Sequence, residues 1–366
     1  RGKNMKKITT LILSLVFAAS IIGSASARTL KIQLTFPKTS YDGGIVKMWT
    51  DRVTKLTRGE LQFELLSKGE VVGMKETLEA VDKGLVDGGA AWTHYWSNYH
   101  PAAMLFGSPV AGGGIGLTSQ SWLAWYFDNG GMELYDRMWD EMGMNVKGFI
   151  MAASGPEALG WFKEPINSMD DFRKYRFRTP PGIPGQTYKD IGVASVSMSG
   201  GDILPALEKG TIDAAEWCCP VSDMAFGFQK VLKHYYLQGL HQNVVNGDVY
   251  INGDVYKSLT EHQKYAMEIA SEAMITRNIT NRAVGNGKAL LELTTKHGVI
   301  LHDTPADYFV EYMNAAQATI KKNAEENAFF KEVYEHMTEH AKAVVPYVAQ
   351  TQTSDAAIGT AFASQQ

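Results

Sequence analysis

The side chains best placed for chemistry are two acids, one of which belongs to a repeated sequence unit. The unit reads LEAVDKGLVDGGAAW up to Trp92 and LPALEKGTIDAAEW up to Trp217, and only the second copy has a charged residue, Glu216, directly before its Trp. A carboxylate at such a position can bind a hard cation or transfer a proton. Glu157 is the second candidate acid, and the two carboxylates together would suit an acid and base pair in a secreted lyase or hydrolase.

A run of basic residues lies between these two acids. In the segment DFRKYRFRTPPGIPG, Lys174, Arg176 and Arg178 fall on one side of a predicted strand, and Tyr175 and Phe177 fall on the other. The prolines that follow end the strand. A surface position is the simplest interpretation for Lys174 and Arg176.

Other patterns that mark enzymes or metal centres are missing from the sequence. There is no G-x-S-x-G, H-E-x-x-H or Walker A motif, and no G-x-G-x-x-G at a strand-to-helix turn. His336 and His340 lie four residues apart, but HMTEH lacks the zinc-protease order, so a solvated helix face is expected. Cys218 and Cys219 are the two cysteines, and because adjacent cysteines rarely form a disulfide we expect small buried side chains.

The repeated unit also predicts the architecture. Each copy has a helical pattern that ends at Lys-Gly and then leads into a strand, because glycine accepts the left-handed conformation at a helix end. Two such units more than a hundred residues apart indicate two α/β lobes, with a ligand crevice at the carboxyl ends of their strands.

The rest of the chain alternates strands and helices, which predicts mainly parallel sheets. Strands are expected at Arg28–Phe36 and Leu61–Leu66, with a buried strand from Asn145 to Met151 that could cross between the lobes. Two long helical stretches are expected, at about Glu261–Lys296 and Pro305–Tyr347. The polar tail, 348–366, is expected to be flexible.

Composition and the N-terminus place the chain among exported globular proteins. The 366 residues are 45% hydrophobic and 20% charged, enough for two domains. Met5-Lys6-Lys7, an apolar run and Ala25-Ser26-Ala27 form a signal-peptide pattern with cleavage after Ala27, so residues 1–27 are taken as upstream residues and signal peptide. Removing them changes the net charge from −4 to −8, which argues against nucleic acid as a partner.

Several motifs in order resemble one family. The segment FRTPPGIPGQTYKDIGVASVSMSGGDILPALEKGTIDAAEW, the first repeat and NGDVYKSLTEHQK are similar to the substrate-binding proteins of tripartite ATP-independent periplasmic (TRAP) transporters. The resemblance covers nearly all of the mature chain. It implies a periplasmic, non-catalytic protein with a two-lobed Venus-flytrap fold and long C-terminal helices. Lobe closure on a small carboxylate and delivery to TRAP membrane subunits would follow.

The resemblance also assigns roles to residues. The arginine at position 178 clamps the ligand carboxylate in that family, which suits a planar guanidinium. Glu216 and Trp217 match a branch that binds 2-oxo and 2-hydroxy monocarboxylates, often through a cation.

The expected cation site departs from that branch at two positions. Glu157 stands where a Gln is expected and Gln242 where an acid is expected, so the metal set would be Glu216, Trp217 and Gln242 around Na⁺ or Ca²⁺. Because an acid replaces an amide at position 157 and an amide replaces an acid at position 242, one amide and two acids could still surround the ion. It could equally mean that the cation is lost and that Glu157 faces a ligand amine or indole nitrogen.

Aromatic residues suggest what else lines the pocket. Phe36, Trp92 and Tyr95 are candidates for ligand contact, although most aromatic side chains belong to a core. The glycine-rich segment SPVAGGGIG, Ser108 to Gly116, would leave room in the crevice. A bulky ligand, such as an indole or phenyl 2-oxo acid, is therefore expected beside pyruvate-sized ones.

The lobes can be given approximate boundaries. Lobe I would comprise residues 28–150 and about 244–285, and lobe II 151–243 and about 286–347. The resemblance further implies that the long C-terminal helices could form a homodimer.

Overall fold

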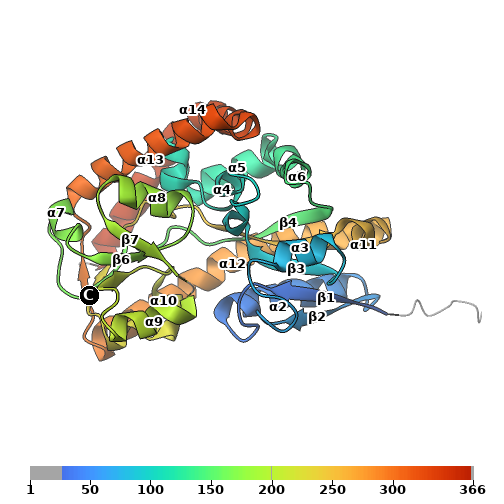
Figure 1. Cartoon of the computed structure of the whole chain (residues 1–366), viewed down its shortest axis with the longest axis horizontal. Coiled ribbons are helices and arrows are strands. Elements are labelled where there is room, and N and C mark those ends of the chain that lie inside the picture. The colour runs from blue at the N-terminus through green and yellow to red at the C-terminus, as the bar shows by residue number, and fades with distance from the viewer. Residues whose placement is uncertain (1–26, 199, 364–366) are drawn as a thin grey trace, which may run out of the picture.

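The computed structural model describes residues 27–198 and 200–363, which fold into two α/β lobes (Figure 1). Lobe I is built on a five-stranded sheet of order β2-β1-β3-β10-β4, and lobe II on a six-stranded sheet of order β11-β9-β5-β8-β6-β7. The predicted two-lobed α/β fold is confirmed. The signal-peptide prediction falls on residues outside the described part of the chain. Within that part, no helix combines the length and apolar character that a membrane span requires.

The sheet of lobe I takes one strand from far along the chain. β1 (Arg28–Leu34) pairs in parallel with β2 (Leu61–Leu66) and β3 (Gly88–Trp92). β10 (Asn246–Asn252) lies antiparallel between β3 and β4 (Val146–Ala153). The expectation of a mainly parallel sheet was wrong, because the chain leaves lobe I after β4 and re-enters through β10 in the opposite direction.

Lobe II is mixed for a similar reason. β6 (Arg176–Thr179) is parallel to β7 (Ala194–Ser197) and β8 (Ala214–Ala215). β5 (Gly160–Phe162), the first strand after the crossing, is antiparallel to β8 and β9 (His234–Tyr236), and β11 (Ile300–His302) completes the edge.

Both repeats form the predicted helix, glycine stop and strand. α3 (Thr77–Asp82) is followed by Gly84 at φ 69° before β3, and α9 (Gly200–Glu208) is followed by Gly210 at φ 66° before β8. The positive φ explains the glycines, since a side chain there would strain the turn. Glu216 and Trp217 therefore follow a central strand of lobe II directly.

One long helix connects the lobes. α12 (Glu261–Lys296) begins at a capping box on Thr260 and has the predicted bounds. It packs against β4 and α2 (Tyr41–Leu56) in lobe I and against α10 (Pro220–Phe226) in lobe II (Figure 1).

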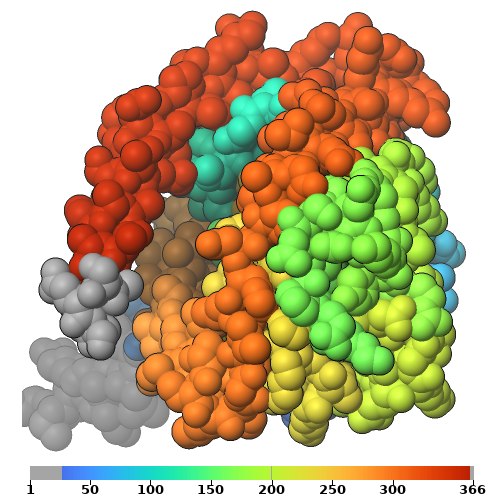
Figure 2. Space-filling model, turned by 90° about the vertical axis from the view of Figure 1, so that its left-hand side faces the viewer, coloured from blue at the N-terminus to red at the C-terminus, as the bar shows by residue number. Residues whose placement is uncertain are grey.

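The predicted C-terminal stretch is two helices, α13 (Ala306–Glu326) and α14 (Ala328–Ala363), separated at Asn327. Residues 349–363 of the tail continue α14 as an exposed helix, and the flexibility of the tail stays a prediction (Figure 2). Five alanines in this stretch favour helix, which explains the continuation. The expected solvated face was wrong for His340, which is buried, whereas His336 is exposed and accepts from Trp125 Nε1 at its Nδ1 at 2.9 Å.

The glycine-rich segment does not line the crevice. Its helical turn η2 (Val110–Gly114) is buried and contacts α13, and a Cβ on Gly112 would lie 2.3 Å from the backbone oxygen of Leu117. The glycines thus serve close packing and a left-handed backbone. The remaining helices are η1 (Thr93–Trp96), α4 (Ala103–Gly107), α5 (Ser119–Asp128), α6 (Gly131–Glu141), α7 (Met169–Phe172), α8 (Ile183–Asp190), η3 (Phe228–Lys230) and α11 (Gly253–Lys257).

Candidate functional site

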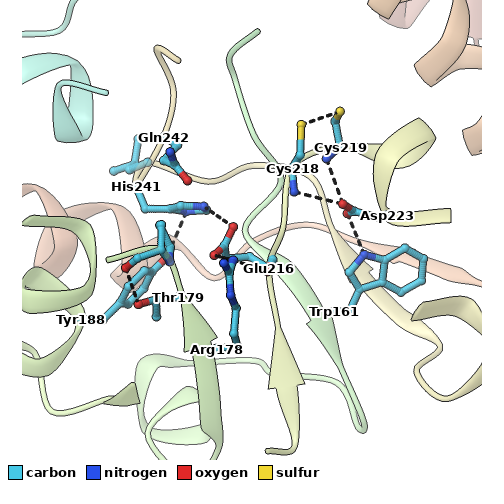
Figure 3. A network of polar contacts seen from close by, with 12 residues as sticks. Trp161, Arg178, Thr179, Tyr188, Glu216, Cys218, Cys219, Asp223, His241 and Gln242 are labelled. Carbon is cyan, nitrogen blue, oxygen red and sulfur yellow. Dashed lines mark hydrogen bonds and ion pairs between the residues drawn. The ribbon is translucent and has the colours of Figure 1, made fainter. Parts of the chain in front are cut away.

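Arg178 is the centre of a buried polar network in lobe II (Figure 3). It is held by β6, and its side chain is only 5% exposed. Nη1 donates to the Glu216 carboxylate at 2.5 Å and to the Glu216 backbone oxygen at 2.9 Å, while Nε and Nη2 donate to the Met198 carbonyl. The guanidinium is thereby fixed in one orientation before any ligand arrives.

Glu216 links Arg178 to a histidine that the sequence interpretation had missed. Its second carboxylate oxygen lies 3.5 Å from His241 Nε2, and both side chains are fully buried. His241 Nδ1 lies 3.1 Å from the Tyr188 hydroxyl, which is 3.2 Å from the Tyr308 hydroxyl. The tyrosine pair therefore fixes the ring so that Nε2 points to Glu216.

Glu157 completes a group of three potential metal ligands. Ligand atoms of Glu157, Glu216 and His241 all lie within 4.8 Å of one another. Each residue has a buried atom without a hydrogen-bond partner among the described residues: Glu157 Oε2, Glu216 Oε2 and His241 Nε2. Buried polar atoms normally have partners, so three unpaired atoms in one place fit the binding of a ligand or an ion.

The electrostatics of Glu157 agree with this interpretation. Burial raises the pKa of its carboxyl group well above the ordinary value, and the neighbouring Glu216 raises it further. A cation between the two carboxylates would remove this repulsion and accept both oxygens. The side chains present therefore fit a bound cation.

The other predicted residues of lobe II and its border lie nearby. The Trp217 ring lies 5.0 Å from the Arg178 guanidinium carbon and packs edge-on against Phe226. Burial raises the pKa of the Tyr95 hydroxyl, which also feels the charges of Arg178 and Glu216.

Gln242 is buried beside this cluster, and its amide nitrogen is 3.5 Å from His94 Nε2. Burial lowers the pKa of His94 to about 3, so that ring is neutral near pH 7.

Phe36 and Trp92 belong to a pocket on the lobe I side. It is lined by Phe36, Asp42, Ile45, Ala91, Trp92, Met151, Ala152, Gly247, Asn278 and Arg282. Apart from Asp42, Asn278 and Arg282, the lining is apolar. The Asp42 carboxylate accepts from Arg282 Nη2 at 2.7 Å, so this pair forms the polar end of the pocket.

The sequence signals explain what was found and what was missed. Arg178 and Glu216 stand out by repeat position and by resemblance, whereas His241 is adjacent to Gln242, the residue chosen after LQGLH. Arg282 and Asp42 meet across 240 residues, and neither lies in a motif.

Comparison with known proteins gives a consistent result. A family model described as "Bacterial extracellular solute-binding protein, family 7" (DctP) matches residues 34–327. A monocarboxylate 2-oxoacid-binding periplasmic protein of Nostoc sp. is 32% identical over 289 residues, 78% of this chain and 76% of its own length.

Solved structures agree in fold. A TRAP transporter solute-binding protein from Bordetella bronchiseptica has a TM-score of 0.85 at 25% identity, covering 93% of this chain and 99% of that one; it is a dimer with copurified calcium and picolinate in one site. A TRAP periplasmic solute-binding protein from Pseudoalteromonas atlantica, with sodium and pyruvate bound, has a TM-score of 0.81 at 21% identity, covering 91% and 98%.

The match over most of the chain removes the alternative of a secreted lyase or hydrolase using Glu157 and Glu216, since this family is non-catalytic. The two lobes, the buried arginine on β6 and these similarities lead to one assignment. The chain belongs to the DctP family, family 7 of the bacterial extracellular solute-binding proteins, which serve TRAP transporters in the periplasm.

Proposed function

We propose that this protein captures a small 2-oxo monocarboxylate between its lobes and delivers it to TRAP membrane subunits. The observation that carries the proposal is the buried Arg178 network beside three unpaired ligand atoms. The relatives that bind 2-oxo acids support the substrate class.

The chain's own side chains account for recognition. Arg178 provides a fixed positive charge, and four of its five N–H donors have partners among the described residues, which leaves one for a ligand oxygen. A buried guanidinium interacts strongly with a carboxylate because little water screens the pair. Micromolar affinity, on the order of 8 kcal/mol, needs only this contact and apolar enclosure.

A cation would complete the site. We propose that Na⁺ or Ca²⁺ is held by Glu216 with Glu157 or His241, and that Trp217 and Gln242 contribute as the sequence predicted. Such an ion supplies positive charge for the oxygens of a 2-oxo acid. Without it, a ligand carboxylate would meet two buried acids, which is unfavourable. In the alternative, Glu157 would accept a hydrogen bond from a ligand amine or indole nitrogen.

The lobe I pocket sets the side-chain preference. Phe36, Trp92 and Met151 offer an apolar surface for the substituent of the acid. Tyr95, whose hydroxyl feels the charges of Arg178 and Glu216, is kept as a proposed ligand contact. A bulky or aromatic 2-oxo acid with a phenyl or indole group is therefore a candidate beside pyruvate-sized ones.

A homodimer through α14 is also proposed. Tyr347, Ile358 and Phe362 are 69%, 70% and 63% exposed on this helix. Their spacing places them on one face, and an exposed apolar face suits contact with a second copy. The dimeric Bordetella protein supports this arrangement.

The test is titration calorimetry on the mature chain after partial unfolding and dialysis to strip ligand. Pyruvate, 2-oxoisovalerate, phenylpyruvate and indole-3-pyruvate would be titrated in buffer with calcium, with sodium, and with a chelator in sodium-free buffer. Binding of at least one 2-oxo acid, weakened when both ions are withheld, is expected. Binding that is independent of both ions would keep the substrate class and discard the cation, and no binding of any 2-oxo acid would overturn the proposal.

A further inference from the structure

The two cysteines lie together at the contact between the lobes. Cys218 and Cys219 follow Trp217 directly and are 6% and 2% exposed. Their sulfur atoms are 2.8 Å apart, closer than two non-bonded sulfurs normally approach (Figure 3).

Lobe II holds the backbone of both residues firmly. Asp223 Oδ1 accepts from the backbone N–H of Cys218 at 3.0 Å and of Cys219 at 3.1 Å. The other oxygen of Asp223 accepts from Trp161 Nε1 and from the Tyr235 hydroxyl, each at 2.9 Å. The carboxylate thus fixes the turn in which the two sulfurs meet.

Arg282 connects the sulfurs to lobe I. Its Nη1 lies 3.3 Å from Cys218 Sγ and 3.2 Å from Cys219 Sγ, and its Nη2 donates to Asp42 on α2. The guanidinium also lies over the rings of Tyr41 and Trp92. The same arginine therefore contacts the dithiol and the proposed ligand pocket.

We propose that Cys218 and Cys219 form a reversible vicinal disulfide that makes ligand binding sensitive to oxidation. Adjacent cysteines rarely close because the ring is strained, but here the fold already holds the sulfurs in contact. Strained disulfides are also the easily reduced ones, as a reversible bond requires.

Hydrogen peroxide is small enough to be the oxidant. It transfers one oxygen to the Cys219 thiol, giving a sulfenic acid and one water. The Cys218 sulfur then attacks the Cys219 sulfur, the S–O bond breaks, and the oxygen leaves as a second water with the two remaining protons. Two electrons pass from the sulfurs to peroxide. Opening of the lobes would expose this turn to solvent.

The disulfide would change the Arg282 contacts. Arg282 Nη1 donates to both sulfurs, and the turn after Trp217 must shift to bring the sulfurs to bonding distance, which moves them away from this donor. Arg282 then loses its link to lobe II while keeping Asp42. This part rests on the proposed function: closure around a 2-oxo acid should weaken by roughly tenfold in Kd, the size of one lost hydrogen bond to a charged group.

Mass spectrometry tests the bond independently of any ligand. The reduced mature chain is treated with peroxide, quenched, denatured and alkylated. We expect the peptide with both cysteines to lose two hydrogens, to take up no alkyl group, and to regain both thiols with dithiothreitol. Alkylation of both cysteines, or their separate conversion to sulfinic or sulfonic acids, would overturn the proposal. In Cys218→Ser the remaining Cys219 should be oxidised to an acid, because it has no partner.

Calorimetry tests the coupling. The Kd for a bound 2-oxo acid should rise in the peroxide-treated protein and recover after reduction. The Cys218→Ser/Cys219→Ser double variant is the control for the oxidation of methionines. We expect its Kd to be the same before and after peroxide. An equal Kd for oxidised and reduced wild type would overturn the coupling. Failure of all 2-oxo acids to bind either form would instead count against the proposed function.

Discussion

Arg176 and Arg178 are two residues apart on the same face of β6, yet their surroundings differ. Arg178 is buried against Glu216, whereas Arg176 is exposed and pairs with Asp213. We expect Arg178→Lys to raise the Kd for a 2-oxo acid by roughly 10- to 100-fold, because an ammonium group cannot replace a fork of donors. Arg176→Lys is the matched control and should leave the Kd unchanged. Calorimetry measures both, and equal effects of the two variants would remove Arg178 from the site.

Glu216→Gln separates the cation from the fold. The amide oxygen can still accept from Arg178, but the negative charge needed by a cation is lost. We expect ligand binding in this variant to be weak and indifferent to chelator, with some loss of stability from the unpaired arginine. Asp213→Asn, which alters the exposed pair of lobe II, serves as control. Chelator-sensitive binding in Glu216→Gln would show that the cation lies elsewhere.

Asp248 gives a pH dependence of stability. This carboxylate in β10 accepts from Tyr135 and Thr93, but burial raises its pKa from 3.8 to about 7. Between these values the unfolded chain loses the proton and the folded chain keeps it, so the stability from this group is present at pH 4 and is lost as pH rises through 7. In Asp248→Asn, the decrease in the free energy of unfolding between pH 5 and pH 7.5 should be smaller by about 1–2 kcal/mol. Urea unfolding at the two pH values measures this, and an unchanged slope would contradict it. The pKa of Asp223 is also raised to about 7, so the free energy of unfolding of Asp248→Asn should still decrease somewhat over this pH range.

Among single residues, the sequence predicted those that belong to a repeat or to a family motif. Glu216 was singled out by comparing two copies of one unit, and Arg178 by resemblance. His241 and Arg282 could not be found in this way, because their roles arise from contacts with residues distant in the chain, Glu216 and Asp42. The contact of the two cysteines with Arg282 has the same origin.

Elements were predicted well where the signal is local. The start of the helix at about Glu261 and the glycine after each repeat helix depend on a few neighbouring residues, and the structure has both; a capping box at Thr260 begins that helix. Strand direction was not predicted, since β5 and β10 enter their sheets from the other lobe. The helix in residues 349–363 was not predicted, because the polar composition of the tail was given more weight than its alanines.

The end of α14 gives a prediction for an element. Residues 349–363 form helix, yet residues 351–362 are exposed, so their removal should cost the lobes little. We expect the mature chain to be a dimer and a chain ending at residue 348 to be a monomer with the same ligand affinity, as measured by light scattering and calorimetry. A mature chain that is monomeric at micromolar concentration would contradict the dimer. Ile358→Asp with Phe362→Asp tests the same face without shortening the helix.

The whole molecule depends on contacts that span the two lobes. Lobe I supplies an apolar pocket and Asp42, lobe II supplies Arg178 and the acids, and α12 carries Arg282 between them. A ligand that contacts both lobes shifts the population toward the closed form. The sequence predicted two lobes and a crevice from the repeat, but the side chains that join the lobes are visible only once the chain is folded.

The Arg282–Asp42 pair should therefore control closure. Asp42 is largely buried, and burial raises the pKa of its carboxyl group, whereas the neighbouring Arg282 lowers it. The charged form of Asp42 therefore depends on its contact with Arg282. In Asp42→Asn the guanidinium loses its counter-charge, and since a broken buried pair costs about 3–5 kcal/mol, even a third of this in the closed form raises the Kd roughly tenfold. Asp51→Asn, on the same helix but in an exposed pair with Lys47, should have no effect. Small-angle scattering with saturating 2-oxo acid should show wild type and Asp51→Asn contracting fully, while Asp42→Asn needs more ligand to reach the same radius. Full contraction of Asp42→Asn at the wild-type ligand concentration would mean that the pair only stabilises the fold around α2.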